Sequence, residues 1–159
     1  MSGQATIAIG SNIWVAQVAT TSAELSAGLS GVASIPANTG VLFDMGAEYG
    51  TIWIDMTDML FSLDIIFMDS NGVVVDIMRD VTPPTDTAFA PGGGIGARYF
   101  IEVNAGEAVN VSIGDIAVIE ITGGVDDVGD TPSTLDINAL LQPLIVVMMV
   151  GMMMKIMPK

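Results

Sequence analysis

Short apolar runs separated by turn residues are the feature that most constrains the fold of this sequence. The runs are three to six residues long and rich in Val, Ile and aromatic residues, which is typical of strands rather than helices. The predicted strands are Thr6–Ile9, Ile13–Val18, Val41–Phe43, Ile52–Ile54, Leu63–Met68, Val73–Met78, Tyr99–Val103 and Ile116–Ile121. We therefore predict a mainly β fold of the α+β type, a compact β-barrel or sandwich-like domain.

Two turns and one helix punctuate these strands. Asp69-Ser70-Asn71-Gly72 predicts a hairpin turn, because Asn-Gly accepts positive φ angles, and Asn104-Ala105-Gly106 predicts another turn. Thr21 precedes Glu24 by three residues, the spacing of a capping box at a helix start. Leu25 and Leu29 would share one face of this short helix, which Gly28 or Gly31 would end.

The chain divides into three parts by composition. Residues 1–121 form the acidic β-rich domain, residues 122–135 are a Gly/Asp/Pro linker, and residues 136–159 form a Met-rich apolar helix that includes Pro143. Eleven consecutive apolar residues run from Leu144 to Met154. We expect this helix to be a membrane anchor or a buried assembly helix. The candidate membrane or assembly residues are Leu144, Ile145, Val146, Val147, Met148, Met149, Val150, Met152, Met153 and Met154.

The missing residue types exclude several functions. The chain has no His and no Cys, which removes the commonest general base, thiolate chemistry, disulfides and nearly every zinc site. Both lysines, Lys155 and Lys159, lie in the last five residues, so a lysine cannot replace the missing base within the domain. We expect no catalytic residue, no cofactor and no metal. Residues 1–121 carry 14 acidic and two basic residues, a net charge of −12, which argues against nucleic-acid binding.

Two local patterns have a functional and a structural interpretation. Asp55, Asp58, Asp64 and Asp69 could bind a cation such as calcium, or supply paired carboxylates for hydrolysis, but surface charge and turn chemistry explain them better. Asp64 lies within a strand-like run, where a carboxylate needs hydrogen-bond donors, so we predict a role in the fold. Gly92-Gly93-Gly94-Ile95-Gly96 lacks the Gly-Lys-Ser/Thr ending of a P-loop and predicts a long loop.

A series of short motifs resembles the domain-of-unknown-function family 192, small β-rich proteins of bacteria and archaea, over about residues 13–120. The motifs occur in the family's order: Ala23-Glu24, Gly28-Leu29, Gly40-Val41-Leu42-Phe43, Trp53 with Thr57, Leu63-Asp64-Ile65-Ile66-Phe67, Asp69 to Val75, Arg98-Tyr99, Glu102-Val103, Ala105-Gly106 and Gly114-Asp115. The chain has Trp53-Ile54-Asp55-Met56-Thr57 where the family usually has Trp-Met-Lys-Asn-Thr, and Ser62-Leu63-Asp64 where it has Pro-Leu-Asp. The resemblance implies a fold and no reaction, and it does not cover the C-terminal segment.

Three functions follow as expectations. The first is a non-enzymatic structural or assembly protein, a virion or cell-envelope component, whose acidic domain is displayed on a surface. Its partners would be copies of itself, other structural proteins and a lipid membrane, and it would be localised at a membrane or particle surface, with no signal peptide visible. The second is a small-ligand binding module for a sugar or metal ion, which would use the barrel mouth and the Gly92–Gly96 loop. A carboxylate-only hydrolase is the third.

Overall fold

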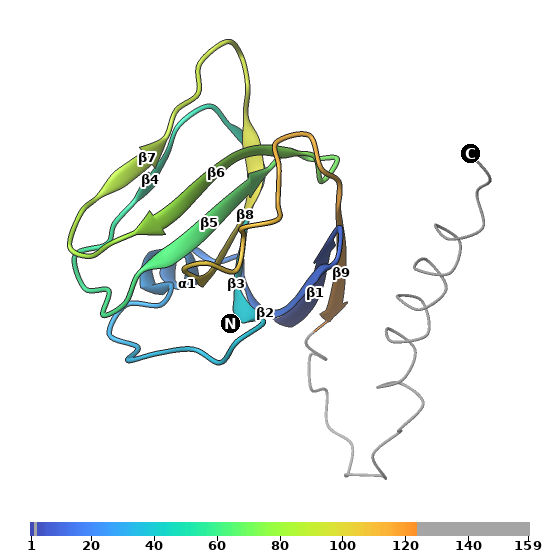
Figure 1. Ribbon diagram of the computed structural model, residues 1–159. Coiled ribbons are helices and arrows are strands. Elements are labelled where there is room, and N and C mark those ends of the chain that lie inside the picture. Colours follow the sequence, from blue (N-terminus) through green and yellow to red (C-terminus); the bar gives the residue numbers. More distant parts are fainter. Residues whose placement is uncertain (2, 124–159) are drawn as a thin grey trace, which may run out of the picture. The chain divides into compact units, whose positions relative to one another are not determined.

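The computed structural model describes residues 1 and 3–123, and there it contains nine strands and one helix (Figure 1). The elements are β1 (Gly3–Ile9), β2 (Asn12–Ala19), α1 (Ser22–Ala27), β3 (Thr39–Tyr49), β4 (Ile52–Ile54), β5 (Leu63–Met68), β6 (Val74–Val81), β7 (Thr87–Phe89), β8 (Ala97–Asn104) and β9 (Ala117–Gly123).

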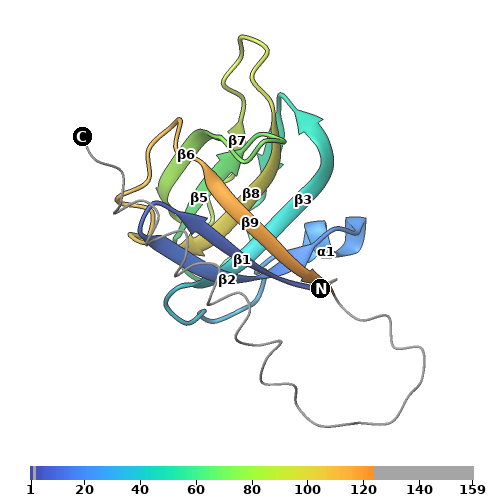
Figure 2. The ribbon, with the colours of Figure 1, turned by 90° about the vertical axis from the view of Figure 1, so that its right-hand side faces the viewer.

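Seven of these strands form one sheet in the order β6-β5-β8-β3-β2-β1-β9, and β4 and β7 form a separate two-stranded ribbon. Neighbouring strands in the large sheet are antiparallel except for β2 and β3, which are parallel. Parallel neighbours need a crossover connection, and α1 lies in that connection. The helix is therefore placed beside the middle of the sheet, at β3 (Figure 2).

Successive residues of the central strands point to opposite faces of the sheet, and both faces are covered. In β5, Ile66 and Met68 belong to one hydrophobic cluster, while Ile65 and Phe67 belong to another. The first core is formed by side chains on one face of the large sheet and by two residues of the connection between β8 and β9. Its members are Ala5, Ile7, Ile9, Trp14, Ala16, Val18, Leu42, Ile66, Met68, Val74, Ile101, Val103, Ala108, Val111 and Ala117. The second core joins the sheet to the β4–β7 ribbon and the region after α1: Ala19, Leu29, Val41, Phe43, Ile52, Ile54, Met56, Met59, Leu63, Ile65, Phe67, Phe89, Ala97 and Phe100.

The large sheet is open, and its two edge strands meet at one corner. Val73, just before β6, forms an isolated antiparallel bridge with Ile116, just before β9. Beside this bridge, the backbone N–H of Val74 donates to the carbonyl of Asp115, and the N–H of Ala117 donates to the carbonyl of Gly72, both at 2.8 Å. The fold is thus a rolled sheet whose edges touch at one point, rather than a complete barrel.

The prediction of a mainly β fold with one short helix is confirmed. Each predicted strand corresponds to an observed one, α1 begins with the expected capping box and ends at Gly28, and Gly92–Gly96 is a loop. The strand β7 was not predicted. The predicted linker beyond residue 123 and the predicted C-terminal helix, including the candidate residues from Leu144 to Met154, lie outside the described residues.

Candidate functional site

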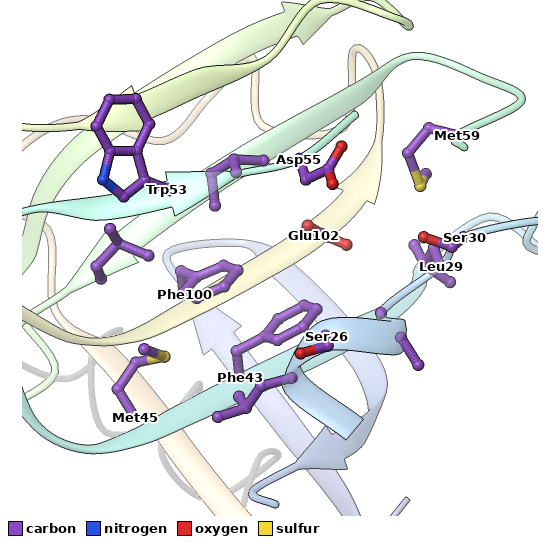
Figure 3. A pocket seen from close by; sticks show the side chains of 15 residues that line it. Ser26, Leu29, Ser30, Phe43, Met45, Trp53, Asp55, Met59, Phe100 and Glu102 are labelled. Atoms are coloured by element: carbon purple, nitrogen blue, oxygen red, sulfur yellow. The ribbon is translucent and has the colours of Figure 1, made fainter. Parts of the chain in front are cut away.

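A pocket of about 310 Å³ opens between α1, β3, β4 and β8 (Figure 3). Its lining residues come from four segments: Leu25, Ser26, Ala27, Gly28, Leu29, Ser30, Phe43, Met45, Ile52, Trp53, Ile54, Asp55, Met59, Phe100 and Glu102. The volume lies at the lower end of the range of small-molecule pockets, and the lining combines aromatic walls with several polar groups.

The capping of α1 fixes the wall of the pocket on the helix side. The Thr21 hydroxyl accepts from the backbone N–H of Glu24 at 3.3 Å, and the Glu24 carboxylate accepts from the N–H of Thr21 at 3.1 Å. The helix ends at Gly28, whose φ of +45° and ψ of −126° are accessible to glycine and strained for other residues. This reversal directs the segment after the helix over the second core, so that Leu29 is buried there.

Two phenylalanines form the aromatic wall. Phe43 of β3 lies directly opposite Phe100 of β8 in the sheet, and their rings stack with centroids 4.3 Å apart and an interplanar angle of 6°. Phe100 also contacts Phe67 of β5, at 5.6 Å between ring centroids. Such aromatic stacking in a buried layer gives a rigid surface.

The ribbon strand β4 contributes the outer rim. Ile52 and Ile54 are buried, whereas Trp53 between them is 80% exposed. Asp55 follows the strand and lies on the same side as Trp53, because strand side chains alternate. Hydrogen bonds from the side chain and backbone of Thr57 lower the pKa of Asp55, so this carboxylate is ionised at neutral pH.

Glu102 is the central polar residue of the pocket. It follows Phe100 by two positions on β8, so its side chain points to the same face, and it is 7% exposed. Its neighbours on the adjacent strands are Val41 of β3 and Ile65 of β5, both apolar and buried. Among the described residues, no hydrogen-bond donor and no cation contacts its carboxylate.

The Glu102 carboxylate therefore faces the pocket. No fully enclosed side-chain nitrogen or oxygen in the described part lacks a partner, so the unpartnered oxygens of Glu102 are open to the pocket space. Burial raises the pKa of Glu102 to about 7, because a charged carboxylate loses hydration there. A ligand that donates hydrogen bonds or carries positive charge would satisfy this group.

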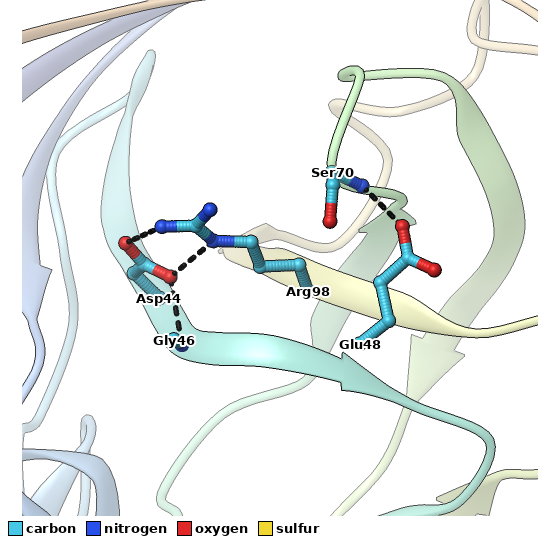
Figure 4. Close-up of polar contacts among 5 residues, drawn as sticks. All are labelled: Asp44, Gly46, Glu48, Ser70 and Arg98. Carbon is cyan, nitrogen blue, oxygen red and sulfur yellow. Dashed lines mark hydrogen bonds and ion pairs between the residues drawn. The ribbon is translucent and has the colours of Figure 1, made fainter.

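Both arginines of the described part are engaged elsewhere. Arg98 donates from Nε and Nη2 to the Asp44 carboxylate at 3.0 and 3.2 Å, beside the contact between Glu48 and the Ser70 backbone (Figure 4). Arg79 donates to the carbonyl of Val111 at 2.7 Å. No basic residue is among those that line the pocket, so an anionic ligand would find no counter-charge.

The predicted acidic candidates are not brought together. Asp64 is buried, and its carboxylate accepts from the backbone N–H groups of Asp80, Gly106 and Ala108, each at 2.9 Å. Asp69 accepts from backbone N–H groups of its own turn. Over residues 3–123, no group of three or more Asp or Glu residues could hold a metal ion. Asp55 alone of the four lines the pocket.

The Gly92–Gly96 loop does not line this pocket. That the loop takes part in ligand binding stays a prediction. Sequence reasoning missed Glu102. The signal that could have found it is an acidic residue inside the apolar strand run Tyr99–Val103. Because side chains alternate along a strand, Glu102 is expected on the same face as Phe100.

No helix within the described part of the chain has the length and apolar character required to cross a membrane. This finding does not bear on the predicted helix of residues 136–159, which lies outside the described residues.

Comparison with known proteins places the domain in one family. The family DUF192, described as "Uncharacterized ACR", matches residues 5–121. A solved structure of a candidate transcription regulator from Sinorhizobium meliloti 1021 superposes with a TM-score of 0.63 at 21% identity, covering 76% of this chain and 94% of that one. A protein of unknown function from Novosphingobium aromaticivorans DSM 12444 has a TM-score of 0.62 at 25% identity, covering 72% of this chain and 83% of that one. No curated protein matches the sequence.

Proposed function

This chain belongs to the DUF192 family, and on that premise we propose that its domain is a small-ligand-binding module that uses the pocket around Glu102. The single observation that carries the proposal is the buried Glu102 carboxylate, which faces the pocket with no partner among the described residues. An acidic residue that is buried in a cleft, with its carboxylate oxygens open to the pocket alone, is a common mark of a binding site.

The surrounding residues support binding rather than catalysis. The stacked pair Phe43 and Phe100 gives the pocket a fixed apolar wall, and exposed Trp53 gives its rim a planar contact surface. The chain has no His or Cys, so no conventional nucleophile and base pair is available beside Glu102. We therefore propose a non-enzymatic role, with specificity set by Glu102 and Asp55.

The test is a Glu102→Leu variant. It places an apolar side chain of similar size in the pocket and removes the carboxylate oxygens. A library of small polar molecules should yield compounds that raise the Tm of the natural protein. The variant should be at least as stable as the natural protein, because it removes an unpartnered buried acid, yet the same compounds should not raise its Tm. Glu120→Leu on β9 is the matched control and should keep the response.

If the library compounds stabilise Glu102→Leu as well as the natural protein, the pocket is not the binding site.

A display or assembly role is our second proposal, and one surface observation favours it. On the outer face of β2, β1 and β9, Ile13, Ala8 and Val118 are cross-strand neighbours, and Ile13 and Val118 are 40% and 46% exposed. Adjacent exposed apolar side chains are typical of contact surfaces. In this role, residues 136–159 would hold the domain to a membrane or a multimeric core.

Met149→Asp tests the assembly role in the full chain. A charge within a lipid-facing helix costs about 3 kcal/mol, so membrane flotation or the oligomer size should fall if the segment is an anchor or an assembly helix. Glu120→Gln, a change on β9, should alter neither property. Unchanged flotation and unchanged oligomer size in Met149→Asp would rule out this role for the segment.

A further inference from the structure

We propose that the pocket around Glu102 receives a primary ammonium group carried on a short alkyl chain, either of a free amine or of a lysine side chain. This inference rests on the proposed binding function and names its ligand class.

Glu102 lacks a counter-charge within the described residues. The residue is 7% exposed and lies between Val41 and Ile65 on the neighbouring strands, and its carboxylate has no donor from the described residues. A buried carboxylate needs both hydrogen bonds and a counter-charge to be favourable when ionised. A primary ammonium supplies a full positive charge and three N–H donors in one compact group.

The aromatic residues of the pocket also favour a cation. Phe43, Phe100 and Trp53 all line the same pocket as Glu102. Cations are attracted to aromatic faces, and Trp binds them best. A carboxylate beside the stacked Phe43 and Phe100, with Trp53 at the rim, therefore favours an alkylammonium over an uncharged ligand of the same size.

The charges of the rim and of the whole domain are negative as well. Figure 3 places Asp55, at the end of β4, around the same pocket as Glu102, so two carboxylates and no basic residue line it. Residues 1–121 carry a net charge of −12, and such a field concentrates cations near a cleft. Met45, Met59 and Leu25 supply apolar contacts for the alkyl part of the ligand.

The same residues argue against the other ligand classes. An anion would face Glu102 and Asp55 without any basic residue in the lining. A metal ion would need more oxygen ligands than these two carboxylates, and residues 3–123 offer no cluster of three. A saccharide could donate hydroxyl groups to Glu102 but would leave its charge unbalanced, so it serves as the competing arm of the test.

The experiment uses the full chain with ¹³C-methyl-labelled methionines and follows the methyl signals of Met45 and Met59 by NMR. The probes are n-pentylammonium and its uncharged counterpart 1-pentanol, together with methyl glucoside as the saccharide. A second pair is Nα-acetyl-lysine methylamide and the same compound acetylated on Nζ. The free amine and the lysine compound distinguish a small-molecule ligand from a protein side chain.

We expect n-pentylammonium to shift both signals saturably, with an affinity at least about tenfold above that of 1-pentanol, the scale of a charge-assisted hydrogen bond. Glu102→Gln should lose roughly the same factor for the ammonium and little for the alcohol. Glu120→Gln should bind like the natural protein. Asp55→Lys, which adds a tethered ammonium at the rim, should also weaken n-pentylammonium binding, and more than Asp55→Asn does.

The outcomes separate this inference from the proposed function. Equal or tighter binding of 1-pentanol or methyl glucoside at Met45 and Met59 overturns the ammonium class and leaves a binding pocket in place. No response of these methyl signals to either ammonium compound also overturns the ammonium class, whereas the binding function itself is decided by the library test on Glu102→Leu. Binding of the lysine compound that survives acetylation likewise contradicts the inference.

Discussion

Asp64 and Glu102 are the two buried acidic residues of the described part, and their carboxylates have opposite surroundings. They lie on the adjacent strands β5 and β8, where Asp64 is paired with Val103 and Glu102 with Ile65. Asp64 accepts three backbone hydrogen bonds, each 2.9 Å long, whereas Glu102 accepts none from the described residues. The first acid therefore stabilises the fold, and the second one costs stability that a ligand could restore.

The pH dependence of stability should change in Glu102→Gln. The pKa of Glu102 is about 7 in the folded chain, above the ordinary value of 4.5, so the folded state binds the proton more tightly. Its contribution to stability is then complete below pH 4.5 and is lost as the pH rises through 7. Relative to the natural protein, Glu102→Gln should gain about 3 kcal/mol between pH 4.5 and pH 8.

Urea unfolding at pH 4.5, 6 and 8 checks this prediction. The other titratable residue of the pocket, Asp55, has a lowered pKa and does not titrate in this interval. Glu120→Gln serves as the control for removing one acid, and its stability curve should run parallel to that of the natural protein. Parallel curves for Glu102→Gln would contradict a buried, unpartnered Glu102.

Asp64→Asn should destabilise the domain without changing ligand binding. The substitution replaces one acceptor oxygen by an NH₂ group, which faces backbone donors and leaves at least one of them unpaired. We expect the free energy of unfolding to fall by about 3 kcal/mol. This is the combined scale of one buried N–H left without an acceptor and of the lost charge on the remaining hydrogen bonds. Asp58→Asn, at an exposed position, should change stability by less than about 0.5 kcal/mol.

Full stability of Asp64→Asn together with a lost ligand response would show that Asp64 acts in binding and not in the fold.

Gly28→Ala should both strain the end of α1 and crowd the pocket. The Cβ atom would lie 3.3 Å from Cζ of Phe43 and 3.8 Å from Oε2 of Glu102. The positive φ adds a cost of about 1–3 kcal/mol for a residue other than glycine. Gly10→Ala is the matched control, because Gly10 also has a positive φ but its added Cβ meets nothing within 4 Å.

Thermal unfolding and the Met59 methyl signal distinguish the two effects. Both variants should lower the Tm, but Gly28→Ala alone should shift the Met59 signal and weaken probe binding. An identical ligand response in Gly10→Ala and Gly28→Ala would place the ligand away from Glu102.

Local sequence patterns predicted the parts of the fold that local interactions determine. The alternation in β2 and the apolar run of β5 identified these strands, and Thr21 with Glu24 identified the start of α1 because a capping box is formed within four residues. The three-residue strand β7 escaped prediction, since Thr87–Phe89 follows a segment rich in Pro, Thr and Asp and gains its strand conformation from pairing with β4. Tertiary pairing of this kind leaves no local signal.

The site was less predictable for a similar reason. Glu102 is unpartnered because Val41 and Ile65 flank it on strands that are distant in sequence, and a single strand does not reveal its neighbours. The pocket brings this residue together with the end of α1 and with Trp53 of β4, both distant from Glu102 in the sequence. By contrast, the structural role of Asp64 could be predicted, because an acid inside an apolar run must find donors wherever the strand is placed.

The last prediction is that the domain folds without the C-terminal segment only if β9 is retained. Residues 3–123 contain both cores, and β9 pairs with β1 over seven residue pairs from Ala117 to Gly123. A chain ending at residue 124 should therefore unfold in one cooperative transition, and its charge should keep it soluble. A chain ending at residue 115 loses β9 and the Val73–Ile116 bridge, which leaves β1 as an unpaired edge above the first core. Far-UV circular dichroism during urea unfolding compares the two chains. The shorter chain should lose its cooperative transition, and a cooperative transition of equal midpoint in both would show that β9 is dispensable for the rolled sheet.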